Sequence, residues 1–139
     1  MTNAIEAHLN AAREAAKEGR AGDARNSYAR AAALSRESGA PLLQAHALRH
    51  LSDLDRAADH LEQALAHAEQ AAALYSANGQ GTSVDMANAL RLRALALDSL
   101  RRAVPAQAVW KAARDLYAGA SVGAGVAECD ARLAPDAGG

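Results

Sequence analysis

The chain has 139 residues, which is the length of about one domain. Its 15 basic and 16 acidic side chains leave a formal net charge of −1, which argues against a general nucleic-acid-binding protein with a basic excess. Hydrophobic residues make up 50% of the chain, a content that excludes the composition typical of a disordered protein.

The hydrophobic half of the sequence is dominated by two strong helix formers. There are 40 alanines and 17 leucines, against eight β-branched residues and no phenylalanine. Alanine and leucine have high helix propensities, whereas strands are enriched in the β-branched and aromatic residues that are scarce here. The composition therefore predicts an all-α protein.

Clusters of helix-breaking residues divide the sequence at intervals of about 40 residues, a period typical of a helical-repeat array. The clusters are Ser38–Pro41, Asn78–Gly81 and Gly119–Gly125. Weaker breaks divide each unit into two helices, at Glu18–Gly22 in the first and Arg102–Pro105 in the third. The predicted helices span 3–18 and 22–38, 42–58 and 60–77, and 84–102 and 105–118.

The end of the chain predicts a short seventh helix over 122–133. Val122, Val126, Cys129 and Leu133 lie at helical spacing and form one apolar stripe. Such a helix would cap the last apolar face of an array. We expect a single domain over 1–134, followed by a flexible tail at 135–139.

Two further local predictions concern the middle of the chain. Thr82 and Asp85 have the spacing of a capping box at the start of the fifth helix. The turn inside the middle unit is expected near Ala58–His60, although no glycine or proline marks it. The bulky residues expected in the core are Leu51, Leu54, Leu61, Leu65, Leu90, Leu97, Leu100 and Trp110.

The second halves of the three units share a small-aromatic-small spacing, with alanine replacing the aromatic residue in the middle unit. These residues are Ala24, Tyr28 and Ala31, then Ala64, Ala68 and Ala71, then Ala106, Trp110 and Ala113. The spacing resembles the second helix of the tetratricopeptide repeat, and Gly19 falls at its interhelical glycine. More narrowly, the stretches 47–53 and 87–91 are similar to segments of small single-domain bacterial proteins of this type. The resemblance implies an α-solenoid of three hairpins at 3–38, 42–77 and 84–118, with a capping helix.

In tetratricopeptide arrays the first helix of each pair lines a concave groove that holds the ligand. The resemblance places polar residues of all three units on that face. They are Asn10, Arg13 and Lys17; His46, Arg49, His50, Asp53 and Arg56; and Asn88, Arg91 and Asp98. Arg49, Asp53 and Arg56 lie on one helix face by spacing alone, so an internal salt-bridge ladder is the alternative to ligand binding.

Arginine and asparagine side chains suit a carboxylate partner, because both present N–H donors. The sequence therefore predicts a non-enzymatic adaptor that binds a protein or an acidic peptide through a mildly basic groove. Two alternatives stay open, which are a self-associating, homodimeric helical-repeat module and a sensor of a small anion or signal molecule.

Other kinds of site find little support in the sequence. His46, His50 and Asp53 could in principle supply metal ligands, but Arg49 and Arg56 flank them, and we predict no metal and no cofactor. Phosphate-binding loops and nucleophile elbows are absent. Cys129 lies on an apolar stripe and is expected to be a packed thiol. The first residues lack a signal-peptide pattern and no stretch is long enough to span a membrane, so we expect a cytoplasmic protein.

Overall fold

The computed structural model describes residues 2–134, and within this range the chain is helical with no strand. Its seven helices are α1 (Thr2–Lys17), α2 (Ala21–Glu37), α3 (Pro41–Ala57), α4 (Leu61–Ala77), α5 (Val84–Ser99), α6 (Ala103–Gly119) and α7 (Gly123–Leu133). The prediction of an all-α protein is confirmed, and all seven predicted helices are present. The predicted tail at 135–139 lies outside the described residues.

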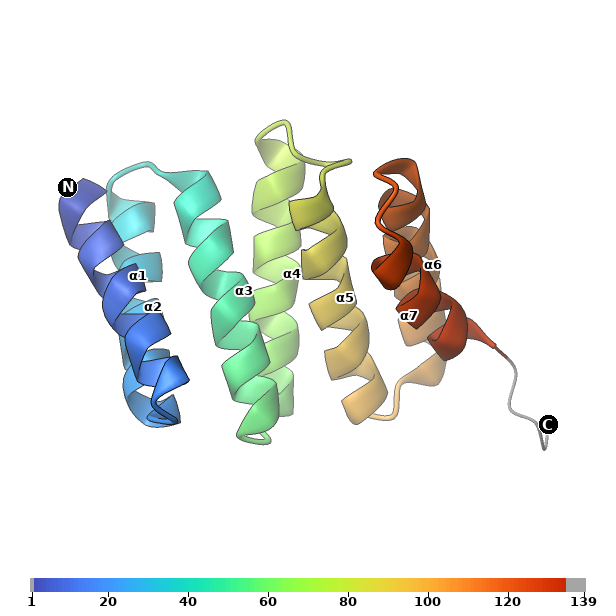
Figure 1. Cartoon of the computed structure of the whole chain (residues 1–139), viewed down its shortest axis with the longest axis horizontal. Coiled ribbons are helices and arrows are strands. Elements are labelled where there is room, and N and C mark those ends of the chain that lie inside the picture. The colour runs from blue at the N-terminus through green and yellow to red at the C-terminus, as the bar shows by residue number, and fades with distance from the viewer. Residues whose placement is uncertain (1, 135–139) are drawn as a thin grey trace.

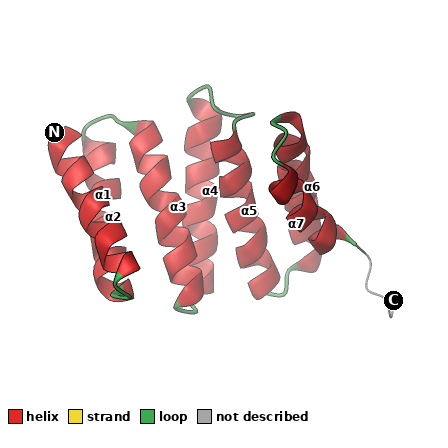
Figure 2. Ribbon diagram, in the orientation of Figure 1, coloured by secondary structure: helices red, strands yellow, loops and turns green. Residues whose placement is uncertain are grey.

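The helices form a row in which each one packs against its neighbours in the chain. Figure 1 shows the row in two layers, with α1, α3, α5 and α7 in front and α2, α4 and α6 behind. The connections are short loops, drawn green in Figure 2. None of the described helices combines the length and the apolar character that a bilayer crossing requires.

The six connections between helices share one backbone conformation. One residue in each has a positive φ, between 60 and 78°, and the amide of the next residue donates to a carbonyl of the preceding helix at 2.7–2.9 Å. This pairing ends a helix by satisfying carbonyls that its last turn leaves free. The six residues are Gly19, Gly39, Asp59, Gly79, Arg101 and Ser121. Successive members of this set are 20 residues apart, except Gly79 and Arg101, which are 22 apart. Two such intervals make the period of about 40 residues.

Three local predictions are wrong in detail. The N-cap of α5 is Ser83 rather than Thr82, and its hydroxyl accepts from the Met86 amide at 3.0 Å. α5 ends at Ser99 because Arg101 adopts the left-handed conformation and closes the turn early. α6 then begins at Ala103, and Pro105 lies inside its first turn, where the missing proline N–H has no helical acceptor to lose.

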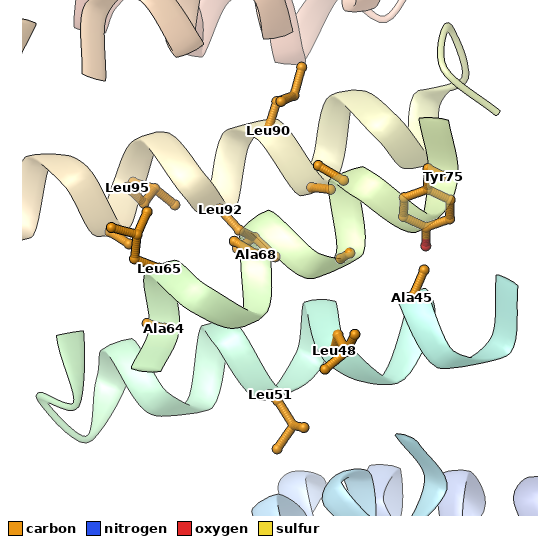
Figure 3. Packing of buried hydrophobic residues seen from close by; sticks show 14 of the residues in the cluster. Ala45, Leu48, Leu51, Ala64, Leu65, Ala68, Tyr75, Leu90, Leu92 and Leu95 are labelled. Atoms are coloured by element: carbon orange, nitrogen blue, oxygen red, sulfur yellow. The ribbon is translucent and has the colours of Figure 1, made fainter. Parts of the chain in front are cut away.

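The core depends on close helix contacts through alanine rather than on large side chains. In Figure 3, Ala64 and Ala68 of α4 lie at its interfaces, while Leu51 points from α3 towards the N-terminal helices. Of the predicted core residues, Leu51, Leu65, Leu90, Leu97 and Trp110 are buried. Leu54 and Leu100 are partly buried against the core. Leu61 is half-buried, because it begins α4 beside the turn.

Candidate functional site

Most of the polar residues predicted to line a groove gather on the face formed by the odd-numbered helices, which we call the odd-helix face. Four hollows follow one another along it, of about 510, 560, 170 and 290 Å³. The first two lie at α1 and α3, the third between α3 and α5, and the fourth between α5, α6 and α7. Asn10, Arg13, Lys17, His46, Arg49, His50, Asp53, Asn88 and Arg91 each line at least one of them.

Two predicted residues have other surroundings. The Asp98 carboxylate accepts from Trp110 Nε1 at 2.8 Å and lies 3.6 Å from Arg132 of α7, so it holds α6 and α7. Arg56 donates to Asp53 on its own helix at 2.7 Å and lines none of the four hollows. The Arg49–Asp53–Arg56 ladder, the alternative to ligand binding, is therefore present only in part. Only its second rung forms, and Arg49 pairs with Asp85 of α5 at 3.5 Å.

Arg49 lies at the centre of the odd-helix face and is the most enclosed of its arginines. Its side chain is only 15% exposed, and its guanidinium lies 5.9 Å from the ring centroid of Tyr75. One terminal nitrogen approaches Asp85 and His46, but the buried Nε has no acceptor among the described residues. A buried donor without a partner carries a desolvation penalty.

Beside Arg49, two histidines and a tyrosine form an aromatic floor. The His50 ring stacks on the Tyr28 ring at 4.8 Å with an interplanar angle of 7°, and the His46 ring meets His50 edge-on at 4.7 Å. Burial, together with repulsion from His46 and Arg49, lowers the pKa of His50 to about 4. Burial and Arg49 also lower the pKa of His46. Both rings are therefore neutral at pH 7, and the positive charge of this face comes from arginine and lysine.

The charges of the odd-helix face are unevenly paired. Arg49, Arg56 and Arg91 each have a carboxylate partner, whereas Arg13 and Lys17 have none within residues 2–134. Arg13 instead donates to Asn10 Oδ1, one turn earlier on α1. These two cations and the Glu14 carboxylate line the 560 Å³ hollow over Tyr28 and His50. Glu6 lines the neighbouring 510 Å³ hollow, so two carboxylates balance the two cations in number, although neither cation forms an ion pair within residues 2–134.

The C-terminal half is occupied by the chain's own groups. Arg91 makes a two-bond fork to Glu128 of α7, at 2.5 and 3.1 Å, and this bonding holds the pKa of Glu128 below its ordinary value. Asn88 Oδ1 accepts from the Tyr117 hydroxyl at 2.6 Å. Asn88 and Arg91, which the sequence places in the groove, are therefore already bonded to Tyr117 and Glu128.

Sequence reasoning missed several residues that shape this face. Tyr28 and Tyr117 are buried, and they contact His50 and Asn88, which are 22 and 29 residues away in the sequence. Glu128 was read only as part of the last helix, and it reaches Arg91 from 37 residues away. Such pairs leave no periodic signal in the sequence.

Other expected residues and groups lie as follows. The Cys129 thiol is fully buried, and burial raises its pKa, which opposes formation of the reactive thiolate. Within residues 2–134, no group of three His, Cys, Asp or Glu side chains is arranged to hold a metal ion.

No protein-family model and no curated protein sequence match this chain. The tetratricopeptide resemblance stays a prediction.

Proposed function

We propose that this protein is a non-enzymatic adaptor, built as a solenoid of three tetratricopeptide-like hairpins and a capping helix, that binds an acidic peptide on its odd-helix face. The observation that carries the proposal is a set of cations in adjoining hollows with no carboxylate or only a distant one. Arg13 and Lys17 have no carboxylate partner within residues 2–134, and the Arg49 guanidinium lies 3.5 Å from the exposed Asp85. An acidic segment lying across α1 and α3 would supply carboxylates to all three.

The hollows suit an extended or helical peptide better than a small molecule. They are shallow, lie side by side over three helices and mix polar with apolar lining residues. Carboxylates on successive turns or on alternate residues of a peptide could reach Arg13 and Arg49, while His50 and Asn10 offer neutral hydrogen-bonding groups. Arg91 is bound to Glu128 by two hydrogen bonds, whereas Arg49 makes only a 3.5 Å contact with the exposed Asp85. The anchors of this proposal are therefore Arg13, Lys17 and Arg49.

The test is selection of randomised peptides displayed on phage, followed by anisotropy measurements with the enriched peptide. We expect enrichment in Asp and Glu, and an affinity that falls at least about tenfold in an Arg13→Glu/Arg49→Glu variant, which corresponds to 1.4 kcal/mol or more. The matched control is Arg30→Glu/Lys111→Glu, which reverses two exposed cations on the even-numbered helices. Enrichment without acidic residues, or an equal loss in both variants, would contradict the proposal.

A further inference from the structure

Three ion pairs link the last helix to the helices before it. Besides the Glu128–Arg91 fork, Asp130 pairs with Arg114 at 2.6 Å and Arg132 pairs with Asp98 at 3.6 Å. Cys129 is the one fully buried residue of α7, and Val122, Val126 and Leu133 are only partly buried. Partly exposed ion pairs contribute little each and are screened by salt, so α7 is the most easily released of the described helices.

The surface under α7 is nevertheless specific in shape. Gly125 lies directly on the Tyr117 ring, and a Cβ atom built at Gly125 would come within 2.5 Å of a ring carbon. Tyr117 cannot swing aside easily, because it is 3% exposed and its hydroxyl is bonded to Asn88. The surface therefore accepts a helix only if a residue without a side chain passes over Tyr117.

The position of α7 connects this surface to the odd-helix face. Arg91 lines both the 170 Å³ hollow that it shares with Arg49 and the 290 Å³ hollow that it shares with Glu128 and Gly125. Release of α7 would free the Arg91 guanidinium at the C-terminal end of the row of hollows. Glu128 thus holds the place that a partner's carboxylate would take.

We propose that α7 is an exchangeable occupant of the surface formed by α5 and α6, and that an amphipathic helix of a partner protein replaces it. The chemistry of that helix follows from α7 itself. It carries a carboxylate for Arg91, a glycine over Tyr117 and an apolar stripe in the positions of Val122, Val126 and Leu133. The inference rests on the proposed function, since it assigns a partner segment to the C-terminal end of the same face.

Two glycines of α7 provide a matched pair of variants. Gly125→Ala places a methyl group against Tyr117, whereas Gly123→Ala meets no atom within 4 Å. Both substitutions raise helix propensity, so a lower propensity cannot explain detachment of α7 from α5 and α6. Only Gly125→Ala should displace α7, and circular dichroism of the full chain should show that the remaining helices persist.

The probe is a fluorescein-labelled synthetic peptide of residues 119–134, kept reduced because it contains Cys129. In the wild type it competes with a tethered α7 whose effective concentration is on the order of millimolar. We expect the Gly125→Ala chain to bind the peptide at least about tenfold more tightly than the wild type or Gly123→Ala does. A peptide carrying Glu128→Gln should bind measurably more weakly, because its amide keeps one acceptor for Arg91 but loses the charge and the second bond of the fork.

The inference is overturned if the Gly125→Ala chain keeps its helix content and binds the peptide no better than the wild type. If Gly125→Ala does not fold, the full chain carrying Glu128→Gln provides the same test, since its own α7 lacks the carboxylate while the peptide keeps it. Equal binding of the peptide by that chain and the wild type would also overturn the inference. Neither result depends on Arg13 or Arg49. A failure of helix exchange can therefore be distinguished from a failure of the proposed peptide binding.

Discussion

Asp55 of α3 is the only charged residue in the buried core of the described chain, and its removal offers a sensitive test of the packing. Its side chain is 5% exposed, and its Oδ2 accepts from His67 Nδ1 of α4 at 2.8 Å. Arg25 of α2 and His60, the residue before α4, lie 3.9 and 4.0 Å from Oδ1. One carboxylate therefore connects three consecutive helices.

Asp55→Ala should destabilise the protein by about 2 kcal/mol, the usual size for losing a hydrogen bond to a charged group and leaving its donor unpaired. The full cost of breaking a buried ion pair does not apply, because Arg25, His60 and His67 are 34, 45 and 30% exposed at their side chains and can regain water. With a urea m-value of about 2 kcal/mol/M, the unfolding midpoint should fall by about 1 M.

Asp53→Ala is the matched control on the same helix. Asp53 is 57% exposed, and within residues 2–134 its one ion pair is with Arg56 one turn away, so its loss should change the free energy of unfolding by less than about 0.5 kcal/mol. Urea titrations followed by circular dichroism at 222 nm measure both variants. Equal midpoints for Asp53→Ala and Asp55→Ala would refute the reasoning that burial makes the Asp55 contacts matter. Additivity of Asp55→Ala with His67→Ala would refute their direct coupling.

Three further predictions concern pH, the core and the turns. The pKa of His50 is about 4 in the folded chain and 6.5 ordinarily, so as pH falls the unfolded chain binds a proton at His50 before the folded chain does. The free energy of unfolding should therefore fall as pH drops from about 6.5 to about 4. His50→Phe should flatten this pH dependence in urea titrations, and an unchanged slope would assign it elsewhere. Trp110→Ala should cost about 3–5 kcal/mol of stability, because Trp110 is 1% exposed, and a loss under 1 kcal/mol in urea would contradict its place in the core. Arg101→Gly and Ser121→Gly should each stabilise the protein by up to about 1 kcal/mol and so raise its melting temperature, because both residues have φ near 60°, where glycine has no Cβ penalty. A lower melting temperature by calorimetry would show that the unfolded-state entropy of glycine dominates.

The sequence by itself determined the helices and their order. Alanine and leucine dominate the chain, and the breaks recur at a regular distance, so helix existence and most boundaries follow from local propensity and period. Glycine marked three of the six turns. At the other three, Asp59, Arg101 and Ser121 adopt the same left-handed conformation, and only the packing of the flanking helices imposes it on them.

The tertiary structure alone decided what each polar residue of the candidate site contacts. Helical spacing alone puts Asn88 and Arg91 on one side of their helix, because side chains three or four residues apart share a side, and the structure shows that both line a hollow with Arg49 of α3. It could not show that Arg91 is bound to Glu128, that Asn88 is bound to Tyr117, or that Arg49 Nε is left without an acceptor. These outcomes depend on contacts between helices 29 to 37 residues apart, where distance and angle are set by how alanine-lined surfaces pack and not by any local pattern.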